Sequence, residues 1–116
     1  MSQEAIDLPE FLDRVQDDKE LLLELLDIFS EDYQQKRRQL GESVRSQNFE
    51  DIKNIAHSMK GASGNISAKP VREIFLTLEI MGKNNDLSGI DDLLIKLDAR
   101  FEELRQRIAT IKEELG

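Results

Sequence analysis

Apolar residues recur at intervals of three and four along most of the chain, and short polar stretches separate the segments that carry them. Such spacings place apolar side chains on one face of an α-helix. Applied along the chain, this test predicts five helices, over roughly 7–15, 18–46, 48–66, 69–84 and 88–115. The clearest stripe, in the second of them, consists of Leu22, Leu25, Phe29, Tyr33, Leu40 and Val44.

The breaks between these segments carry the residues that suit helix ends. Asn48 can cap the third helix, Pro70 suits the first turn of the fourth, and the run "NNDLSG" interrupts the chain before the last. No segment shows the alternation of apolar and polar residues that is typical of a β-strand. Four long amphipathic helices with short connections predict an all-α fold, an antiparallel up-down-up-down four-helix bundle. The short extra N-terminal helix would lie across one end.

Length and charge restrict the classes of function. The 116 residues suit one domain, and a formal net charge of −8 argues against nucleic acid or an anionic membrane as partner. The chain has no cysteine, no signal-peptide pattern and no apolar run long enough to span a bilayer. We therefore expect a cytoplasmic protein without a disulfide framework.

The stretch "IAHSMKGASGN" places the only histidine, His57, beside two glycines within a predicted helix. Each glycine costs about 1 kcal/mol relative to alanine in a helix interior. At 100° per residue, His57 points away from the apolar stripe, and Lys60, Gly61 and Gly64 lie within roughly 60° of it. Glycines that serve internal packing would face the core. We interpret this pair as clearing the surface for an external partner.

A turn near Ala68 would bring a carboxylate to the level of the histidine. His57 lies eleven residues before Ala68, and Glu79 lies eleven residues after it. Glu79 can then accept a hydrogen bond from Nδ1–H of the imidazole, which leaves the lone pair on Nε2. Lys83, one turn further, adds positive charge nearby. An ordinary solvated histidine, glutamate and lysine remain the alternative at this point.

The segment "AHSMKGASGNISA" resembles the signature of histidine-containing phosphotransfer (HPt) domains. In that family the histidine is followed by lysine at plus three, glycine at plus four and a small residue at plus six. Here these are His57, Lys60, Gly61 and Ser63. The resemblance extends upstream through "LLDIFSEDY" and downstream through "LTLE". One departure is Ser67, where the family often has glycine.

The resemblance implies a phosphorelay carrier of a two-component system rather than an enzyme. His57 would take a phosphoryl group from one receiver-domain aspartate, or from a histidine kinase, and pass it to another receiver. Lys60 would offset charge on the phosphoryl oxygens, and Glu79 would orient the ring. Phosphoryl transfer depends mainly on positioning and charge stabilisation, so these few groups are adequate.

The partners implied are a response-regulator receiver domain, which supplies the aspartate and Mg²⁺, and an upstream hybrid histidine kinase. Gly61, Gly64 and Lys83 would take part in docking. We expect no cofactor and no metal site in the chain itself, and a monomer. The chain would be either free-standing or part of a larger hybrid sensor kinase.

Two other classes of protein also display a histidine on a helix. An autokinase dimerisation domain normally has an acidic residue directly after the histidine and a proline nearby, whereas here Ser58 follows and the next proline is Pro70. A helical adaptor would bind signalling partners without phosphorylation. A four-helix metal protein is disfavoured, because one histidine cannot supply the usual pairs of ligands.

Overall fold

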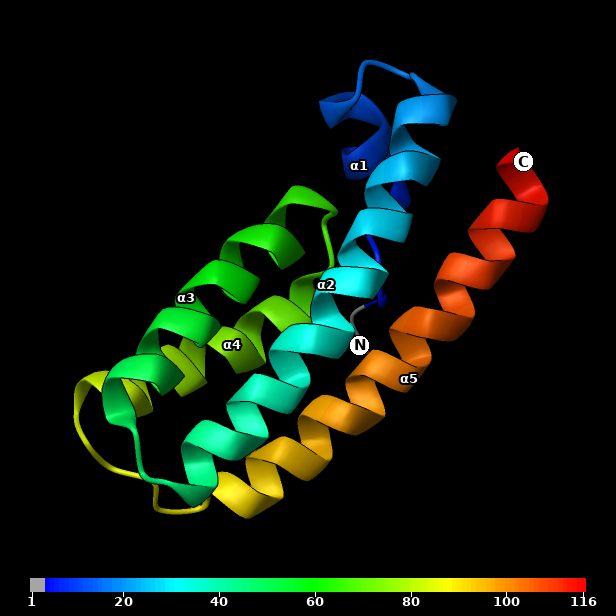
Figure 1. Cartoon of the computed structure of the whole chain (residues 1–116). Helices are drawn as coiled ribbons and strands as arrows, with labels where there is room; N and C mark the ends of the chain where they lie inside the picture. Colours follow the sequence, from blue (N-terminus) through cyan, green and yellow to red (C-terminus); the bar gives the residue numbers. More distant parts are fainter. Residues whose placement is uncertain (1–3) are drawn as a thin grey trace.

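The computed structural model describes residues 4–116, and all regular structure within them is helical. This confirms the all-α prediction. The elements begin and end within two residues of the predicted ranges (Figure 1). They are α1 (Leu8–Arg14), α2 (Lys19–Arg45), α3 (Phe49–Asn65), α4 (Lys69–Lys83) and α5 (Ile90–Leu115).

Polar side chains cap the N-termini of the first three helices. Asp7, Asp18 and Asn48 each accept a hydrogen bond from the backbone N–H three residues further on, so each satisfies one donor that the first turn leaves free. Helix α4 has no such cap but carries Pro70 in its first turn. Helix α5 follows Gly89, whose φ is +76°.

The chain reverses after α2, α3 and α4 through a residue in the left-handed conformation. These residues are Gln47, Ser67 and Asn85, with φ of 55°, 57° and 53°. After each of them, the next N–H donates to the carbonyl oxygen five residues earlier, at 2.9 to 3.0 Å. The pattern is that of a Schellman motif, which usually has glycine at the left-handed position. Each reversal therefore needs only a few residues.

Helices α3 and α4 run in opposite directions and approach each other closely at Gly82. A Cβ at this position would lie 2.7 Å from the backbone nitrogen of Lys53 and 3.0 Å from the carbonyl oxygen of Phe49. No side chain fits there unless the helices separate. At the other end of the pair, Arg72 of α4 lies against Gly64 of α3.

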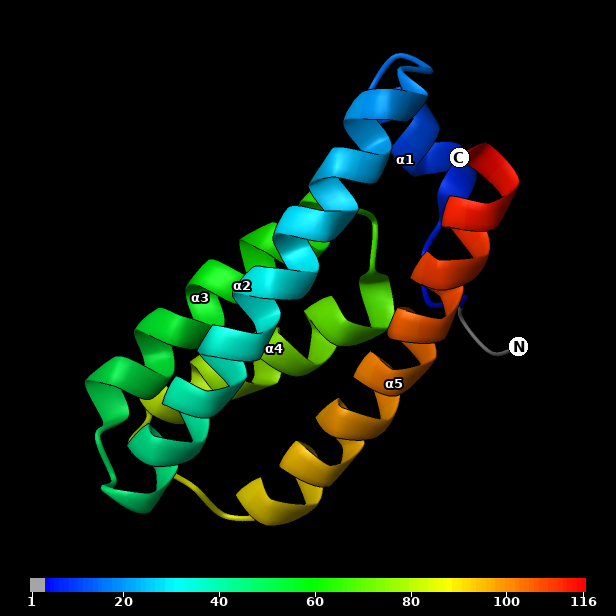
Figure 2. The same ribbon diagram turned by 45° about the vertical axis from the view of Figure 1, so that its right-hand side comes forward.

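Helices α2 and α5 also run in opposite directions, as their ion pairs show. The Arg37 guanidinium binds both carboxylate oxygens of Asp98, at 2.7 and 3.1 Å, and Lys112 pairs with Asp27. Figures 1 and 2 place α3 and α5 on opposite sides of the molecule, with α2 and α4 between them. The helix that carries His57 is thus remote from α5.

The core lies between the four long helices and is closed at one end by the N-terminal segment. Tyr33 stacks on Phe101, with ring centroids 3.6 Å apart, and meets Phe75 edge-on. Ile6, which precedes α1, and Phe11 of α1 are both fully buried in this core. Among residues 4–116, no helix combines the length and apolarity needed to cross a membrane.

Candidate functional site

Helix α3 buries one face and exposes His57 on the other. Ile52, Ala56 and Met59 are fully buried, and Ser63 is buried with them. The side chain of His57 is 70% exposed. The helical spacing of the apolar residues therefore fixes the direction of the imidazole, because the residues that must face the core leave His57 on the solvent side.

The Glu79 carboxylate joins α4 to α3 through two contacts. Its Oε2 lies 2.6 Å from Nδ1 of His57, and its Oε1 lies 2.6 Å from Nζ of Lys60. Only 18% of the Glu79 side chain is exposed. The predicted contact between His57 and Glu79 is present, and Lys60 shares the same carboxylate.

These contacts determine which ring nitrogen is free. The hydrogen bond from Lys60, followed by that from His57, lowers the pKa of Glu79 from its usual 4.5. Glu79 is therefore ionised near neutral pH, and an ionised carboxylate can only accept hydrogen bonds. Nδ1 of His57 must carry the proton that it donates. In the neutral ring, Nε2 then has a free lone pair directed away from Glu79.

The two glycines of α3 have different surroundings. No heavy atom lies within 4 Å of a Cβ built at Gly61, so the surface beside His57 is open there. A Cβ built at Gly64 would lie 3.4 Å from Nε of Arg72, which is an ordinary van der Waals contact. The sequence had led us to expect a bare surface at Gly64, and the structure shows that it is not bare. The Arg72 side chain of the same chain lies against it.

Cations line the junction of α3 and α4 around His57. Lys53 and Lys60 are half-buried on α3, and Arg72 and Lys83 are exposed on α4. Within residues 4–116, Lys60 is the member of this group that has a carboxylate partner. Lys83 lies one turn beyond Glu79, as the sequence indicated, and makes no ion pair with the described residues.

Ser67 connects the turn between α3 and α4 to α1, which the sequence did not reveal. Its Oγ donates to Oε1 of Glu10 at 2.8 Å, and its carbonyl oxygen accepts from the Asp7 N–H at 3.0 Å. Lys69 adds a 2.9 Å ion pair to Glu10. These bonds hold a left-handed serine where the family often has glycine. The position of this turn places His57 and Glu79 at the same height along the antiparallel helices.

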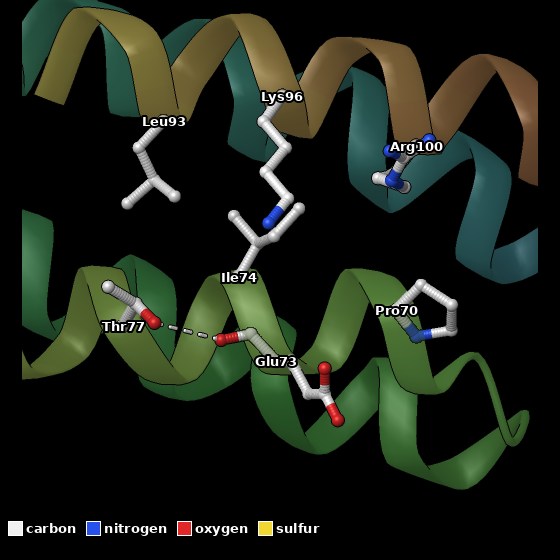
Figure 3. A pocket seen from close by; sticks show the side chains of 7 residues that line it. All are labelled: Pro70, Glu73, Ile74, Thr77, Leu93, Lys96 and Arg100. Atoms are coloured by element: carbon white, nitrogen blue, oxygen red, sulfur yellow. Dashed lines mark hydrogen bonds between the residues drawn. The ribbon is translucent and has the colours of Figure 1, made fainter. Parts of the chain in front are cut away.

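One recess among the described residues lies away from this site (Figure 3). It has a volume of about 450 Å³ and lies between α4 and α5, on the flank of α4 that faces away from Glu79. Its walls are Pro70, Glu73, Ile74 and Thr77 of α4 and Leu93, Lys96 and Arg100 of α5. His57 instead stands on an open helical surface, which suits a reaction with another macromolecule. Among residues 4–116, no three histidine, aspartate or glutamate side chains are grouped as metal ligands.

Comparison with known proteins agrees with this geometry. The family model of the Hpt domain matches residues 24–113. The fold matches the crystal structure of histidine-containing phosphotransfer protein B (HptB) from Pseudomonas aeruginosa PAO1 with a TM-score of 0.89. That alignment covers 97% of this chain and 98% of HptB at 20% sequence identity. A comparison with curated protein sequences gave no significant match.

Hpt proteins are phosphotransfer carriers of phosphorelays rather than classical enzymes, and their partners are receiver domains and kinases. The family match spans most of the chain, including His57, Lys60 and Glu79. On this evidence the chain belongs to the Hpt domain family and is a histidine phosphotransfer protein of a phosphorelay.

Proposed function

We propose that His57 is the residue that carries the phosphoryl group. The observation that carries this proposal is the 2.6 Å hydrogen bond between Nδ1 of His57 and Glu79, on a side chain that is otherwise exposed. The bond fixes the ring and leaves Nε2 as the nucleophile. The group passes between receiver-domain aspartates, or from a histidine kinase to a response regulator.

In the transfer step, the Nε2 lone pair attacks the phosphorus of an aspartyl phosphate. The N–P bond forms, the P–O bond to the aspartate breaks, and the aspartate leaves as a carboxylate. Nδ1 keeps its proton, so the imidazole ring becomes positively charged. The Glu79 carboxylate, already 2.6 Å from Nδ1, stabilises that charge without moving.

Lys60 has two roles in this proposal. Its ammonium group donates one hydrogen bond to Oε1 of Glu79 and so holds the carboxylate in position for His57. An ammonium group has three N–H donors, so two remain for the phosphoryl oxygens. Lys60 thereby offsets negative charge on the transferring group and on the phosphohistidine.

The partner is a receiver domain that brings the reacting aspartate and Mg²⁺, served by an upstream hybrid histidine kinase. Gly61 gives its loops access to His57, Gly64 takes part in docking together with the Arg72 side chain that lies against it, and Lys83 contributes a nearby positive charge. We further propose that residues 1–116 form one monomeric domain that acts in the cytoplasm. In its finer description, the fold is an up-down-up-down four-helix bundle with α1 as the short extra helix.

The proposal is tested by incubating the purified chain with a receiver domain that carries a radiolabelled aspartyl phosphate. We expect the label on the wild-type chain to be lost in acid and stable in base, as a phosphoramidate is. A His57→Gln variant should take up none, while Ser58→Ala, its exposed neighbour, should be labelled as the wild type is. Label on the His57→Gln variant would rule out His57 as the acceptor. An unlabelled wild-type chain that still binds the receiver would favour an adaptor instead.

A further inference from the structure

The exposed side of α4 next to His57 combines apolar and basic residues. Leu76 and Ile80 are 38% and 48% exposed, and one helical turn separates them, so they form a small apolar surface. Arg72 precedes them by one turn, and Lys83 follows them. At 100° per residue the four lie within roughly 80° of one another. We call Arg72, Leu76, Ile80 and Lys83 the α4 strip.

The α4 strip runs alongside the candidate phosphorylation site. Ile80 follows Glu79, whose carboxylate contacts His57. Leu76 and Ile80 lie eight and twelve residues after Ala68, and His57 lies eleven residues before it. In antiparallel helices these counts put both apolar side chains within about 5 Å of the level of the imidazole along the helix axis.

A protein that reacts with His57 must cover more than the imidazole. A stable interface buries on the order of 800 Å² on each partner, and its centre is usually apolar with a polar rim. The α4 strip has this arrangement, because its two apolar residues lie between two cations. A partner seated on His57 can reach it without moving away from the imidazole.

Helix α2, the other neighbour of α3, offers no comparable surface at this level. Its exposed apolar residues, Leu21 and Ile28, lie in its first half. Ile28 is 19 residues before the turn residue Gln47, whereas His57 is 10 residues after it. The nine-residue difference corresponds to about 14 Å along the helix. At the level of His57 along the helix axis, α2 instead exposes polar residues such as Gln35 and Gln39.

The charge of the strip indicates the chemistry of the partner. The whole chain has a net charge of −8, yet Arg72 and Lys83 have no carboxylate partner among residues 4–116. A receiver domain presents a reactive aspartate and carboxylates that bind Mg²⁺. Cations at both ends of the strip complement such an acidic surface.

We propose that the α4 strip is the part of the docking surface that determines which receiver domains the chain serves. Leu76 and Ile80 pack against an apolar patch of the receiver, and Arg72 and Lys83 pair with carboxylates beside it. This inference rests on the proposed function of His57 and adds the specificity of the partner to it.

The apolar part is tested with the double variant Leu76→Gln/Ile80→Gln. The probe is the receiver domain, among those of the same genome, that exchanges phosphoryl groups fastest with the wild-type chain. Transfer rates are measured over a range of receiver concentrations. We expect the half-saturating concentration to rise about tenfold, with little change in the maximal rate, as loss of a contact worth about 1.4 kcal/mol would produce.

Two controls separate docking from chemistry. Ile95→Gln replaces an apolar residue of α5 that is 68% exposed, the largest exposed fraction among the large apolar side chains of residues 4–116. This variant should leave the half-saturating concentration within about twofold of wild type. Phosphorylation of His57 by phosphoramidate, a small donor that needs no docking surface, should proceed equally in all variants. A double variant that behaves like Ile95→Gln would overturn the proposal.

The basic part is tested with Arg72→Glu and Lys83→Glu, compared with Lys96→Glu on α5. We expect each strip variant to lower the second-order transfer rate about tenfold and to weaken its dependence on salt. Arg72→Lys should keep most of the rate. Equal effects of Lys96→Glu and Arg72→Glu would show that only net charge matters and would overturn the proposal. If no receiver labels the wild-type chain, the proposed function itself fails, which is a distinguishable result.

Discussion

Glu79 contacts His57 with one carboxylate oxygen and Lys60 with the other. Counting residues from the turn at Ala68 was enough to pair His57 with Glu79, because antiparallel helices keep equidistant residues level. The second contact was not predictable in this way. The direction of a long lysine side chain depends on where the neighbouring carboxylate lies, which requires the packed helices. The sequence therefore indicated a charge near the phosphoryl group and missed the ion pair that holds Glu79.

Replacing Glu79 with glutamine tests the shared carboxylate at this scale. The amide has nearly the same shape but carries no charge, and it can present either its oxygen or its NH2 group to Nδ1. It therefore no longer fixes the Nδ1–H tautomer, and it stabilises less of the ring charge that develops during transfer. We expect phosphotransfer to slow by about ten- to a hundredfold. Nitrogen-15 NMR of the imidazole should report a mixture of tautomers. A single Nδ1–H tautomer and an unchanged rate would contradict the role given to Glu79.

The same carboxylate predicts a dependence of stability on pH. The pKa of Glu79 is lowered below 4.5 in the folded chain, chiefly by Lys60. Between the two pKa values the unfolded chain binds more protons, so acid favours unfolding. The stabilisation is complete above pH 4.5 and is lost as the pH falls through the lower, folded-state pKa. Urea unfolding of wild type and Glu79→Gln should differ at pH 7, and the difference should shrink as the pH falls below 4.5. A difference that grows in acid would contradict this sign.

At the scale of helices, the α3–α4 pair uses three glycines in two ways. The helical spacing identified Gly61 and Gly64 as facing away from the core, but it did not single out Gly82. That glycine lies on the buried side of α4, where a small residue looks unremarkable until the opposing residues of α3 are known. The structure places a backbone nitrogen 2.7 Å from its missing Cβ. The close approach of two helices depends on the residues of both helices, so the pattern of apolar residues in one helix cannot predict it.

Alanine substitutions separate the two uses of glycine. Gly82→Ala should destabilise the fold by about 1–3 kcal/mol, because the backbone of α3 has to move. Gly61→Ala should instead stabilise it by up to about 1 kcal/mol, since the helix gains propensity and the new methyl group meets open space. Urea unfolding of both variants measures these changes. Loss of stability in Gly61→Ala would mean that this glycine serves internal packing.

Rates of phosphoryl transfer test whether the two exposed glycines of α3 take part in docking. Gly61→Gln places a long side chain beside His57 and should slow transfer from a receiver about tenfold or more while leaving the fold stable. Gly64→Gln should have a smaller effect, because Arg72 already occupies part of that surface. Rates are compared at equal fractions of folded protein. Transfer that falls only in proportion to stability would contradict a docking role for either glycine.

At the scale of the whole molecule, the amphipathic stripes predicted an all-helical fold, and the motif around His57 predicted the family. Both predictions could be made from the sequence because the spacing of apolar residues along the chain reflects the helix period and the buried face of each helix. The exposure of Leu76 and Ile80 was not accessible. Their spacing resembles that of core residues, and only the arrangement of α3 and α5 around α4 shows that these two side chains remain outside. The surface that we propose for docking is therefore the part of this fold least visible in the sequence.

The central claim is that the fold presents one nitrogen, Nε2 of His57, to the phosphoryl donor. Phosphorus and nitrogen NMR of the phosphorylated chain identifies the modified atom directly. Because Nδ1 donates to Glu79 and the ring is otherwise exposed, we predict a single phosphohistidine with phosphorus bonded to Nε2 of His57. Phosphorus bonded to Nδ1, or to any other residue, would contradict the account.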